Sequence, residues 1–503
     1  MTSPSDRDDV VTAPLPLTDA NLGNLPATVS VPTYDRTALR PGVVHIGVGG
    51  FHRAHQAVYF DELARRGLAD DWGLIGVGLH RPQMSEVMRA QDCLYLVVER
   101  GARGTAARVV GAMGRYLYGP EQRPEVLDAL SDPATRLVTL TITGNGYLLT
   151  PDGEFSVDDP LVASELEDPG RPATVFGYLV EALERRRRGG VAPFTVLSCD
   201  NIPSNGAAAR TMVVSFAELR DPGLARWIEQ HVSFPSSMVD RITPETTPEE
   251  RDRVVSSFGV DDRWPVITEP FSQWVIQDDF CNGRPPLEEV GVQFVADVSP
   301  YELTKKRLLN ASHCALGYLG YLAGYRTTAE VMADPAYAAY ISALVDEVIP
   351  LLPSVDGIDL EDYKASLLER LANPEMADQL SRLCRRGSTK VPSYLLPSIT
   401  ETLAAGRPAP LLTLAVAGWF RYLQGEDYAG EPINVEGPKA DVMVDLARRD
   451  GADPRPLLTV RDVFDSLADD PAFVRDLHVA SEALRAGPRE TIETWLAVRG
   501  VRR

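Results

Sequence analysis

The chain has 503 residues, enough for two to four domains at roughly 150 residues each, and a formal net charge of -21. Such acidity argues against nucleic-acid binding, which relies on basic patches that neutralise phosphates. The five cysteines are scattered and include no C-x-x-C pair. This pattern is typical of a reduced, intracellular protein and excludes a disulfide framework or a cysteine zinc site.

The N-terminal region and the apolar stretches indicate neither export nor membrane insertion. Residues 1–40 are rich in Pro, Asp and Thr, which predicts an arm on the surface. Residues 1–17 are polar without an apolar core, so we expect no secretory signal. The longest apolar stretch, Leu411–Phe420, is about half of the roughly 20 residues that a membrane-spanning helix requires. We therefore expect a cytoplasmic protein that binds no membrane.

Short apolar and β-rich runs in the first part of the chain predict a parallel sheet. A run at Val43–Val48 is followed by a glycine turn, a helix at Gln56–Arg66 and a second run at Gly73–Leu79. Together these segments predict a β-α-β unit. Further runs at Arg136–Thr143 and Phe194–Cys199 are typical of buried parallel strands. The pattern predicts a Rossmann-type domain.

Between the last two of these runs, a predicted helix at Thr174–Arg188 ends in four arginines, Arg185–Arg188. Four arginines would suit a nucleic-acid patch. However, a helix C-terminus attracts cations, and the glycines that follow end the helix. We therefore interpret the arginines as the basic end of a helix.

The pattern changes near residue 296, after a β-like run at Val292–Val298. From there on, apolar residues recur at helical spacing over most of the chain. The predicted helices are Lys305–Tyr325, Pro335–Ile349, Asp362–Leu371, Leu411–Leu423 and Phe473–Leu484. The sequence thus predicts an α/β protein, with a Rossmann-type domain at 41–296 and a mostly α-helical domain at 297–503.

The segment after the first predicted strand is similar to a phosphate-binding turn. It reads Gly47-Val48-Gly49-Gly50-Phe51-His52 and stands between a strand and a helix, as the dinucleotide fingerprint requires. The glycines allow a tight turn and the close approach of a pyrophosphate, which the helix N-terminus favours. His52 replaces the third glycine, so a purely structural turn is the alternative. The candidate cofactor-binding residues are Gly47, Gly49, Gly50, Phe51, His52 and Arg53.

The residues after the second strand leave the choice of cofactor open. An acidic residue there usually binds the ribose hydroxyls of NAD, whereas an arginine accommodates the 2′-phosphate of NADP. Residues 79–83 read Leu-His-Arg-Pro-Gln, without an acid and with Arg81 as a candidate partner for phosphate. The residues alone are compatible with NAD and with NADP.

The segment KKRLLNASH at 305–313 offers groups that can move a proton beside a dinucleotide. Oxidation of a secondary alcohol needs a base, for which a lysine tuned to about 7–8 is suitable, and fixed donors such as asparagine amides. Lys305, Asn310 and His313 are the candidates. On a regular helix, Lys306, Asn310 and His313 fall within about 60° of one another, whereas Lys305 widens the arc to about 140°. Periodicity therefore favours Lys306, and a solvated basic face is the alternative without function.

Two polar segments of the first domain add candidates. Asn201 follows the run at Phe194–Cys199, and ligands of open parallel sheets bind beyond the carboxyl ends of strands. Asn201 is therefore a candidate second donor, with a plain turn as the alternative. Because Asn310 belongs to the other domain, the pair predicts a site in the cleft between the domains. Asp240 and Arg241 form a polar pair that suits either substrate contact or a structural ion pair.

Seven longer segments resemble one family, the polyol-specific long-chain dehydrogenases, which include mannitol 2-dehydrogenases and fructuronate reductases. The segments are HIGVGGFHRAHQA, TVLSCDNIPSNG, HVSFPSSMVDRITP, EPFSQWVIQDDFCNGRP, VGVQFVADVSPYE, LLNASHCALGYLGYLAGY and AVAGWFRYLQG. The resemblance implies NAD(P)-dependent oxidation of a secondary carbinol of an open-chain polyol, or the reverse ketose reduction, without a metal. The lack of a zinc signature such as H-E-x-x-H agrees with this expectation.

The resemblance also implies roles for single residues. The family pattern K-x4-N-x2-H falls on Lys305, Asn310 and His313, so it selects Lys305 as the base, against the periodicity. The second asparagine donor of the family falls on Asn201, and its substrate-binding aspartate falls on Asp240.

Within the family, the chain is most similar to the mannitol branch. That branch has an arginine eight residues before the lysine of a G-S-x-K segment, and here these residues are Arg382 and Lys390. Both are therefore implied to bind substrate, and conversion of D-mannitol to D-fructose is the expected reaction. An arginine also suits a uronate carboxylate. A fructuronate or tagaturonate reductase or an arabinitol dehydrogenase is thus the alternative, followed by a dinucleotide-binding sensor without chemistry.

Two positions depart from the family pattern. Gly144 stands where a glutamate is usual, which leaves Glu302 alone for a proton path. The acidic residue that is usual near residues 82–83 is missing, but the resemblance to polyol-oxidising enzymes implies NAD as the cofactor, with NADP possible. The expected partner is a small polyol or ketose, bound by a monomer or a weak homo-oligomer.

Overall fold

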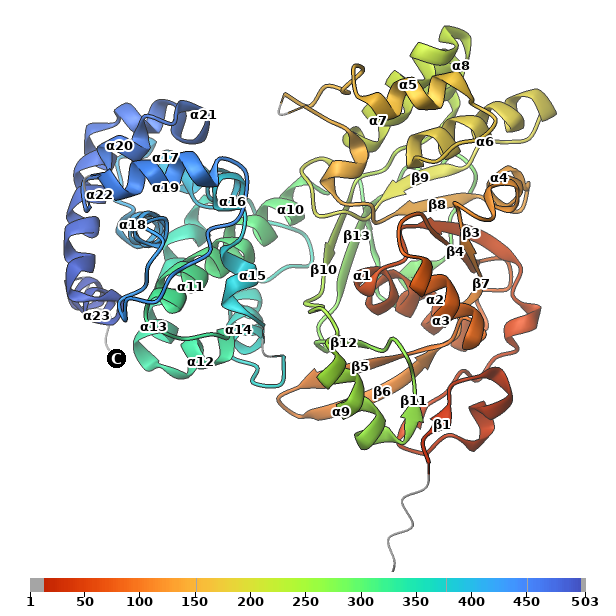
Figure 1. Ribbon diagram of the computed structural model, residues 1–503, viewed down its shortest axis with the longest axis horizontal. Helices are drawn as coiled ribbons and strands as arrows, with labels where there is room; N and C mark the ends of the chain where they lie inside the picture. Colours follow the sequence, from red (N-terminus) through yellow and green to blue (C-terminus); the bar gives the residue numbers. More distant parts are fainter. Residues whose placement is uncertain (1–12, 151, 377, 450, 499–503) are drawn as a thin grey trace, which may run out of the picture. The chain divides into compact units, whose positions relative to one another are not determined.

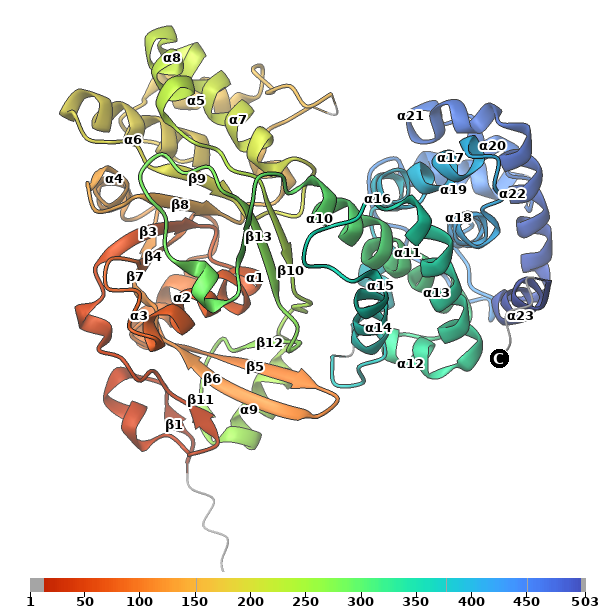
Figure 2. The same cartoon turned by 180° about the vertical axis from the view of Figure 1, so that it is seen from behind.

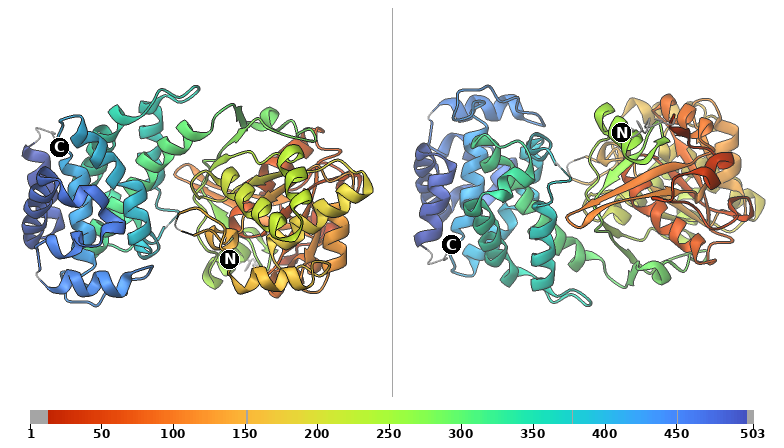
Figure 3. Two further views of the ribbon diagram at one scale, coloured as in Figure 1. Left: turned by 90° about the horizontal axis from the view of Figure 1, so that it is seen from above. Right: turned by 90° about the horizontal axis from the view of Figure 1, so that it is seen from below.

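The computed structural model describes residues 13–150, 152–376, 378–449 and 451–498. The chain divides into two compact units, Met1–Val298 and Ser299–Arg503. Figures 1 and 2 show each unit from opposite sides, and Figure 3 adds two further directions.

A five-stranded parallel sheet forms the centre of the first unit. Its strands, in spatial order, are β7 (Met113–Tyr118), β4 (Gly73–Gly78), β3 (Pro41–Ile46), β8 (Leu137–Leu140) and β9 (Thr195–Ser198). Numbered along the chain, this order is 3-2-1-4-5, as in a Rossmann fold. The order reverses between β3 and β8. In such folds the dinucleotide crevice lies at the carboxyl ends of the strands at this point.

The two faces of the sheet carry separate apolar cores, because side chains alternate along a strand. Val43 of β3 packs in one core with Phe60 and Met88, whereas its neighbour Val44 packs in the other core with Leu179. Helices cover both faces (Figure 1). The first face has α2 (Gln56–Arg65) and α3 (Pro82–Ala90), and the second has α4 (Arg123–Ser131), α6 (Val175–Gly189), α7 (Asn205–Arg220) and α8 (Pro222–His231). The predicted strands and helices of this region are confirmed, although β8 and β9 are shorter than expected.

Three smaller sheets complete the strands of the first unit. Strand β1 (Leu15–Pro16) pairs with β11 (Val260–Asp261), and a four-stranded sheet has the order β12 (Val266–Thr268), β5 (Tyr95–Gly101), β6 (Gly104–Val110) and β2 (Val29–Ser30). The third contains β10 (Ser237–Asp240), β13 (Gln273–Gln277) and β14 (Gln293–Val295). The described part of the predicted N-terminal arm, residues 13–40, thus contributes β1 and β2, while residues 1–12 lie outside the described chain.

Other helical elements of the first unit connect these strands. They are η1 (Asp19–Asn24), η2 (Arg36–Ala38), α1 (Gly50–Ala54), η3 (Gly144–Tyr147), α5 (Pro160–Glu167), α9 (Pro248–Phe258) and η4 (Leu287–Val290).

The arginine run at the end of α6 is bound within the protein. Arg186 is buried and donates to four backbone carbonyl oxygens, those of Leu130, Asp132, Thr135 and Ala192, at 2.5 to 2.8 Å. Burial lowers the pKa of Arg186 to about 10. The other three arginines form ion pairs with acidic side chains of the same unit. The interpretation of this run as a helix end is confirmed.

The described residues of the second unit form mostly helices. Its elements are α10 (Ser299–Lys305), η5 (Lys306–Asn310), α11 (Ala311–Leu322), α12 (Thr328–Ala333), α13 (Pro335–Val348), η6 (Ile349–Leu351), α14 (Leu360–Leu371), α15 (Leu380–Cys384), α16 (Gly387–Tyr394), α17 (Leu396–Ala404), α18 (Pro410–Tyr422), α19 (Ala440–Arg449), α20 (Arg455–Leu458), α21 (Arg461–Phe464), η7 (Asp465–Asp469), α22 (Pro471–Ala483), η8 (Leu484–Ala486) and α23 (Pro488–Val498). The predicted α/β class with a mostly helical second domain is confirmed.

Helices α11, α13 and α18 form the centre of this unit (Figure 2). Helix α18, with the sequence PLLTLAVAGWFRY, is apolar on all sides and therefore buried along almost its whole length. A Cβ at Gly418 would approach the side chain of Leu319 to 2.7 Å, so the glycine permits close packing of α18 on α11. This packing buries α11, which follows the proton-transfer segment, in the centre of the second unit.

Candidate functional site

The glycine turn lies at the carboxyl end of β3, where the strand order reverses. Gly47 has a φ of 102°, and a Cβ there would meet the carbonyl oxygen of Thr141 at 2.2 Å, so only glycine fits. Gly49 is the N-cap of α1. A Cβ at Gly49 or Gly50 would meet no atom outside the adjacent residues closer than 3.7 Å, so this backbone is open. The turn therefore fits the pyrophosphate of a dinucleotide.

The side chains of His52 and Arg53 point into the first unit, whereas Phe51 is partly exposed. The His52 ring stacks on that of His45, with centroids 3.4 Å apart. The Arg53 guanidinium donates to the carbonyl oxygen of Trp264, and its Nε donates to that of Gly49 at 3.3 Å. Any contact of His52 or Arg53 with a dinucleotide is therefore left to their backbone atoms.

The loop after β4 presents two exposed polar side chains. Arg81 is the N-cap of α3, Pro82 occupies its first turn, and Gln83 is exposed beside them. Rossmann folds bind the adenosine ribose after this strand. Neither Arg81 nor Gln83 carries a negative charge that would repel a 2′-phosphate.

The segment after β9 contains two residues that support the backbone, Asp200 and Asn205, and one exposed amide, that of Asn201. The Asp200 carboxylate accepts hydrogen bonds from the backbone N–H groups of Ile142 and Thr143 at 2.9 and 2.8 Å, and burial raises its pKa. The Asn205 amide donates to the carbonyl oxygens of Asp200 and Ser237. Asn201, between these two anchors, is exposed at the carboxyl end of β9. This exposure is compatible with the predicted donor role of Asn201.

The neighbouring loop after β8 contains the departure at Gly144. Thr143 has a φ of 63°, and Gly144 follows it in the exposed η3 turn. A Cβ at Gly144 would meet only the side chain of Ile202, at 3.6 Å. A Cβ at position 144 would therefore fit at ordinary contact distance.

Asp240 and Arg241 lie at the end of β10 and are both buried. Arg241 forms a salt bridge with Glu99, at 2.5 Å. The Nε of Arg241 donates to the carbonyl oxygen of Glu269 at 3.0 Å. The charge of Arg241 therefore has an acidic partner other than its neighbour Asp240. The role of Asp240 in substrate contact stays a prediction.

The proton-transfer segment is not the continuous regular helix that the sequence predicts. Helix α10 ends at Lys305, residues Lys306–Asn310 form the π-turn η5, and α11 begins at Ala311. In a π-turn the hydrogen bonds join residues five apart, so residues at i and i+5 come to the same face. Lys305 and Asn310 are five residues apart. The geometry that favoured Lys306 on a regular helix therefore does not apply.

Lys305 and Lys306 have different environments. Lys305 is buried, with 8% of its surface exposed. Lys306 is partly exposed and forms a salt bridge with Glu302 on the preceding turn. Asn310 is also buried, and its amide nitrogen has no hydrogen-bond partner among the described residues. His313 lies three residues further along, in the first turn of α11, and is partly exposed.

Helices α15 and α16 pack against α11 and carry Arg382 and Lys390. The Arg382 guanidinium forms a bidentate ion pair with the buried carboxylate of Asp378, at 2.6 to 2.9 Å. The Lys390 ammonium donates to the carbonyl oxygen of Leu383 at 3.0 Å, and burial lowers its pKa. Lys390 thus binds the carboxyl end of α15, next to Arg382.

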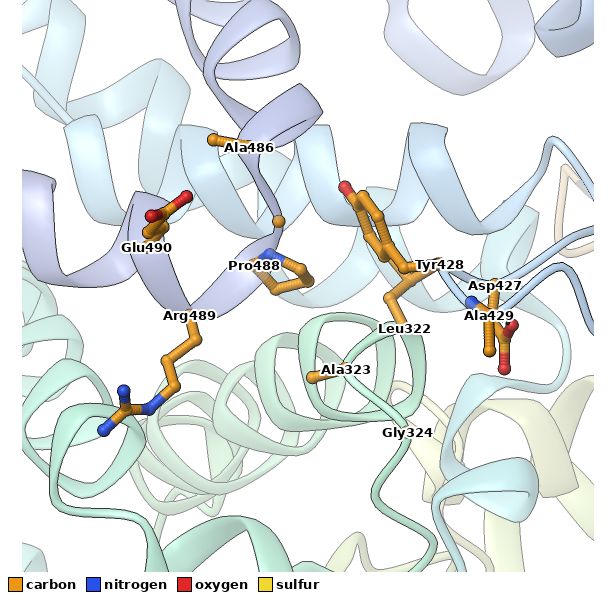
Figure 4. Close-up of a pocket in the computed structure, with 11 residues that line it drawn as sticks. Leu322, Ala323, Gly324, Asp427, Tyr428, Ala429, Ala486, Pro488, Arg489 and Glu490 are labelled. Carbon is orange, nitrogen blue, oxygen red and sulfur yellow. Dashed lines mark hydrogen bonds between the residues drawn. The ribbon is translucent and has the colours of Figure 1, made fainter.

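A cavity of about 500 Å³ in the second unit lies apart from these residues. It is formed by the end of α11, the segment at Asp427–Ala429 and the start of α23 (Figure 4). Arg489, at the edge of the cavity, forms a salt bridge with Asp334, with 2.8 Å between its Nε and the carboxylate oxygen. None of the predicted site residues lines this cavity, so we assign it no catalytic part.

Metal sites and membrane spans are absent from the part of the chain that the structure describes. No group of three or more His, Cys, Asp or Glu side chains in this part is arranged to hold a metal ion. No helix among the same residues combines the length and the apolar character needed to cross a membrane.

Comparison with known proteins identifies the family. The chain matches the family model of the mannitol dehydrogenase Rossmann domain at residues 41–289 and that of the mannitol dehydrogenase C-terminal domain at residues 297–485. The chain belongs to the mannitol dehydrogenase family. The resemblance inferred from the sequence motifs is therefore confirmed.

Relatives within the mannitol dehydrogenase family are similar over nearly the whole chain. The mannitol 2-dehydrogenase of Aspergillus terreus is 43% identical, with 96% of this chain and 100% of that protein covered. Mannitol dehydrogenase DSF1 of Saccharomyces cerevisiae is 45% identical, with 94% and 96% covered. The solved ternary complex of Pseudomonas fluorescens mannitol 2-dehydrogenase with NAD and D-mannitol is 42% identical, with a TM-score of 0.87 and 96% and 100% of the two chains covered. A D-sorbitol dehydrogenase structure is 37% identical, with a TM-score of 0.88 and 95% and 100% covered.

The structure adds features to the mannitol dehydrogenase motifs that sequence reasoning missed. The π-turn was not predicted, although its signal was available in the K-x4-N spacing, which does not fit an α-helix. Asp378 was also missed, although it precedes Arg382 by four residues, a spacing typical of helical ion pairs. The stack of His45 on His52 had no local signal, because one ring is on a strand and the other on a helix.

Proposed function

We propose that this chain is an NAD-dependent polyol dehydrogenase that interconverts D-mannitol and D-fructose without a metal. In this proposal residues 41–296 bind the dinucleotide and residues 297–503 bind the polyol and carry the base. The observation that carries it is the π-turn, which aligns Lys305 with Asn310 in a member of the mannitol dehydrogenase family. Further support comes from the similarity to a mannitol 2-dehydrogenase solved in complex with NAD and D-mannitol.

Lys305 accepts the hydroxyl proton of the polyol carbinol in this mechanism. Its amine is buried, whereas the neighbouring Lys306 is neutralised by Glu302. His313, on the following turn, orients the substrate hydroxyls. Asp240 and Lys390 bind further hydroxyls of the open chain.

Asn310 and Asn201 act as fixed donors to the reacting oxygen. The buried Asn310 amide has no partner among the described residues, which costs about 1–3 kcal/mol of desolvation without compensation. A substrate oxygen would satisfy this amide, and an oxygen that gains negative charge would satisfy it better. Asn201 adds a second donor from the first unit.

In this proposal the glycine turn binds the pyrophosphate of the cofactor through the backbone of Gly47, Gly49, Gly50 and Phe51. The nicotinamide ring supplies the hydride acceptor when the cofactor is bound. The preference for NAD is supported by the similarity to the Pseudomonas fluorescens enzyme, whose ternary complex contains NAD. Because Arg81 and Gln83 do not repel a 2′-phosphate, we propose that NADP is accepted with lower efficiency.

A neutral polyol fits the Arg382 site better than a hexuronate does. The guanidinium already binds both oxygens of Asp378, whose side chain is 3% exposed. A substrate carboxylate would have to compete with this buried charge and would be repelled by it. A hydroxyl group accepts a hydrogen bond from the same guanidinium without that penalty. The ion pair therefore supports the mannitol reaction over fructuronate reduction.

We also propose that the enzyme works in the cytoplasm as a monomer or weak homo-oligomer. The five cysteines are free thiols, four of them buried, which suits a reducing compartment. Size-exclusion chromatography with light scattering tests the oligomeric state.

The reaction is tested by following reduced nicotinamide absorbance while NAD and NADP are crossed with D-mannitol, arabinitol, sorbitol and, in reverse, fructuronate. We expect the highest kcat/KM for NAD with D-mannitol. Turnover of fructuronate alone would establish the uronate alternative. Binding of NADH without turnover of any of the four substrates would favour a sensor without chemistry.

A further inference from the structure

Two histidine rings lie face to face within the first unit, on either side of the glycine turn. His45 is the fifth residue of β3, before the turn, and His52 is the third residue of α1, after it. Their ring centroids are 3.4 Å apart with an angle of 10° between the planes, and both side chains are almost completely buried. The stack therefore joins the strand that enters the turn to the helix that leaves it.

The hydrogen bonds of His45 fix its tautomer. Its Nδ1 lies 2.8 Å from the Thr139 hydroxyl oxygen, and its Nε2 lies 2.9 Å from that of Thr141. The single hydroxyl proton of Thr141 is donated to the carbonyl oxygen of Gly47, at 2.7 Å. Because that proton is used, Nε2 of His45 must carry the hydrogen, and Nδ1 accepts one from Thr139.

This chain of hydrogen bonds reaches the turn itself. Thr141 follows β8, on the other side of the crevice, and it holds Gly47 through its hydroxyl. His45 supports Thr141, and His52 covers the face of His45. Among the described residues no hydrogen bond of normal geometry reaches the ring nitrogens of His52. The side chain of Gln56 interacts with the ring, but the stack is the contact that fixes its plane.

Both rings are neutral, which the stack requires. Burial lowers the pKa of His45 to about 3 and holds that of His52 well below its usual value. The nearby side chains of His45, Arg53 and His55 lower the pKa of His52 further. Two neutral rings can pack at this distance without repulsion between like charges.

We propose that His45, His52 and Thr141 are positioning residues that hold the turn at residues 47–50 in the conformation that binds the pyrophosphate of the cofactor. The inference rests on the proposed dinucleotide function of this turn. None of the three side chains needs to touch the cofactor. They act through the backbone of Gly47 and through the start of α1, and their loss lets the turn leave the conformation in which its amides converge.

The test is a titration of the intact protein with NADH, followed by protein fluorescence, with kcat measured at saturating cofactor and Tm for each variant. His52→Ala removes the stack, and Thr141→Val removes the bond to Gly47 with almost no change in shape. We expect the Kd for NADH to rise at least about tenfold in both, as for residues that orient metal ligands. The value of kcat at saturation should change much less than Kd.

Two conservative variants are the matched controls. His52→Phe restores a stacking ring without its nitrogens, and Thr141→Ser restores the hydroxyl. Each should recover most of the affinity lost in His52→Ala or Thr141→Val. If His52→Phe binds NADH as weakly as His52→Ala, the imidazole nitrogens act directly and the positioning role is refuted. An unchanged Kd in Thr141→Val refutes it as well. Failure of the wild-type protein to bind NADH would instead refute the proposed function of the turn.

Discussion

Lys305 and Lys306 are adjacent in the chain but differ in burial and in partners. Lys305→Ala should lower kcat at least about 10²-fold, the lower range for loss of a general base, because the amine of Lys306 is paired with Glu302 and does not replace it. Lys306→Ala should have a mild effect, because it breaks only a partly exposed ion pair with Glu302. The measurement is the steady-state oxidation of D-mannitol with NAD by both variants. Equal losses in the two variants, or a loss confined to Lys306→Ala, would overturn the assignment.

The unsatisfied amide of Asn310 makes a distinctive prediction about stability. Asn310→Ala should lower kcat about 10²- to 10³-fold, as for loss of one oxyanion donor, with little change in the Kd for NADH. Its Tm should fall little, because the lost amide nitrogen has no partner in the described structure.

Asn205 provides the control, because its amide binds two backbone carbonyls. Asn205→Ala should lower Tm clearly. If Asn310→Ala weakens NADH binding as much as it lowers kcat, Asn310 supports the cofactor and is not a donor to the substrate.

The carboxylate of Asp378 should determine how well Arg382 binds a negatively charged substrate. In Asp378→Asn the guanidinium loses its counter-charge, so kcat/KM for fructuronate should rise by about tenfold or more, which corresponds to about 1.4 kcal/mol. Asp445→Asn is the matched control, since it breaks the exposed i,i+4 pair with Arg449. No gain for fructuronate in Asp378→Asn relative to this control would show that Arg382 does not face the substrate.

At the level of elements, the π-turn marks the limit of prediction from the sequence. Residues 305–309, KKRLL, are good helix formers, so this part of the sequence predicts a helical segment correctly. The choice between i+4 and i+5 hydrogen bonds depends on what the helix packs against. Arg307, inside the turn, is buried and forms an ion pair with Glu401 of α17, a contact that no local pattern reveals. The spacing K-x4-N-x2-H of the family predicts Lys305 as the base, whereas helical periodicity favours Lys306.

The glycine turn shows the opposite case, in which local pattern was sufficient. The apolar run of β3 and the glycines that follow predicted the strand and the crevice, because sterically special positions such as Gly47 leave a trace in the residue type. The inward direction of His52 and Arg53 was not predictable. It depends on His45, Trp264 and other partners that only the folded chain brings near.

The loop between β4 and α3 should control discrimination between cofactors. Gln83→Asp adds a carboxylate that accepts the ribose hydroxyls of NAD and repels a 2′-phosphate, so the ratio of kcat/KM for NAD over NADP should rise. Gln83→Asn, which changes the length without adding charge, is the control. A ratio that responds equally to both variants, or to neither, would show that Gln83 does not face the adenosine ribose.

At the scale of the whole molecule, the reaction should be indifferent to chelators. The described residues contain no cluster suited to a metal ion, and the proposed proton acceptor is an amine. Dialysis against EDTA should therefore leave kcat for mannitol oxidation unchanged. Activity that disappears on dialysis and returns with zinc or manganese would refute the lysine mechanism.

Arg186 provides the first unit with a buried positive charge that binds several backbone carbonyl oxygens, a role that a calcium ion has in many other proteins. Its guanidinium binds four carbonyl oxygens, which come from the end of α4 and from the segments that lead into β8 and β9. Unlike an inorganic ion, this cation is covalently attached and does not dissociate on dilution. A lysine offers three donors on one nitrogen and cannot reproduce the planar fork. Arg186 therefore joins the segments that lead into β8 and β9 of the central sheet, and a chelator cannot remove it.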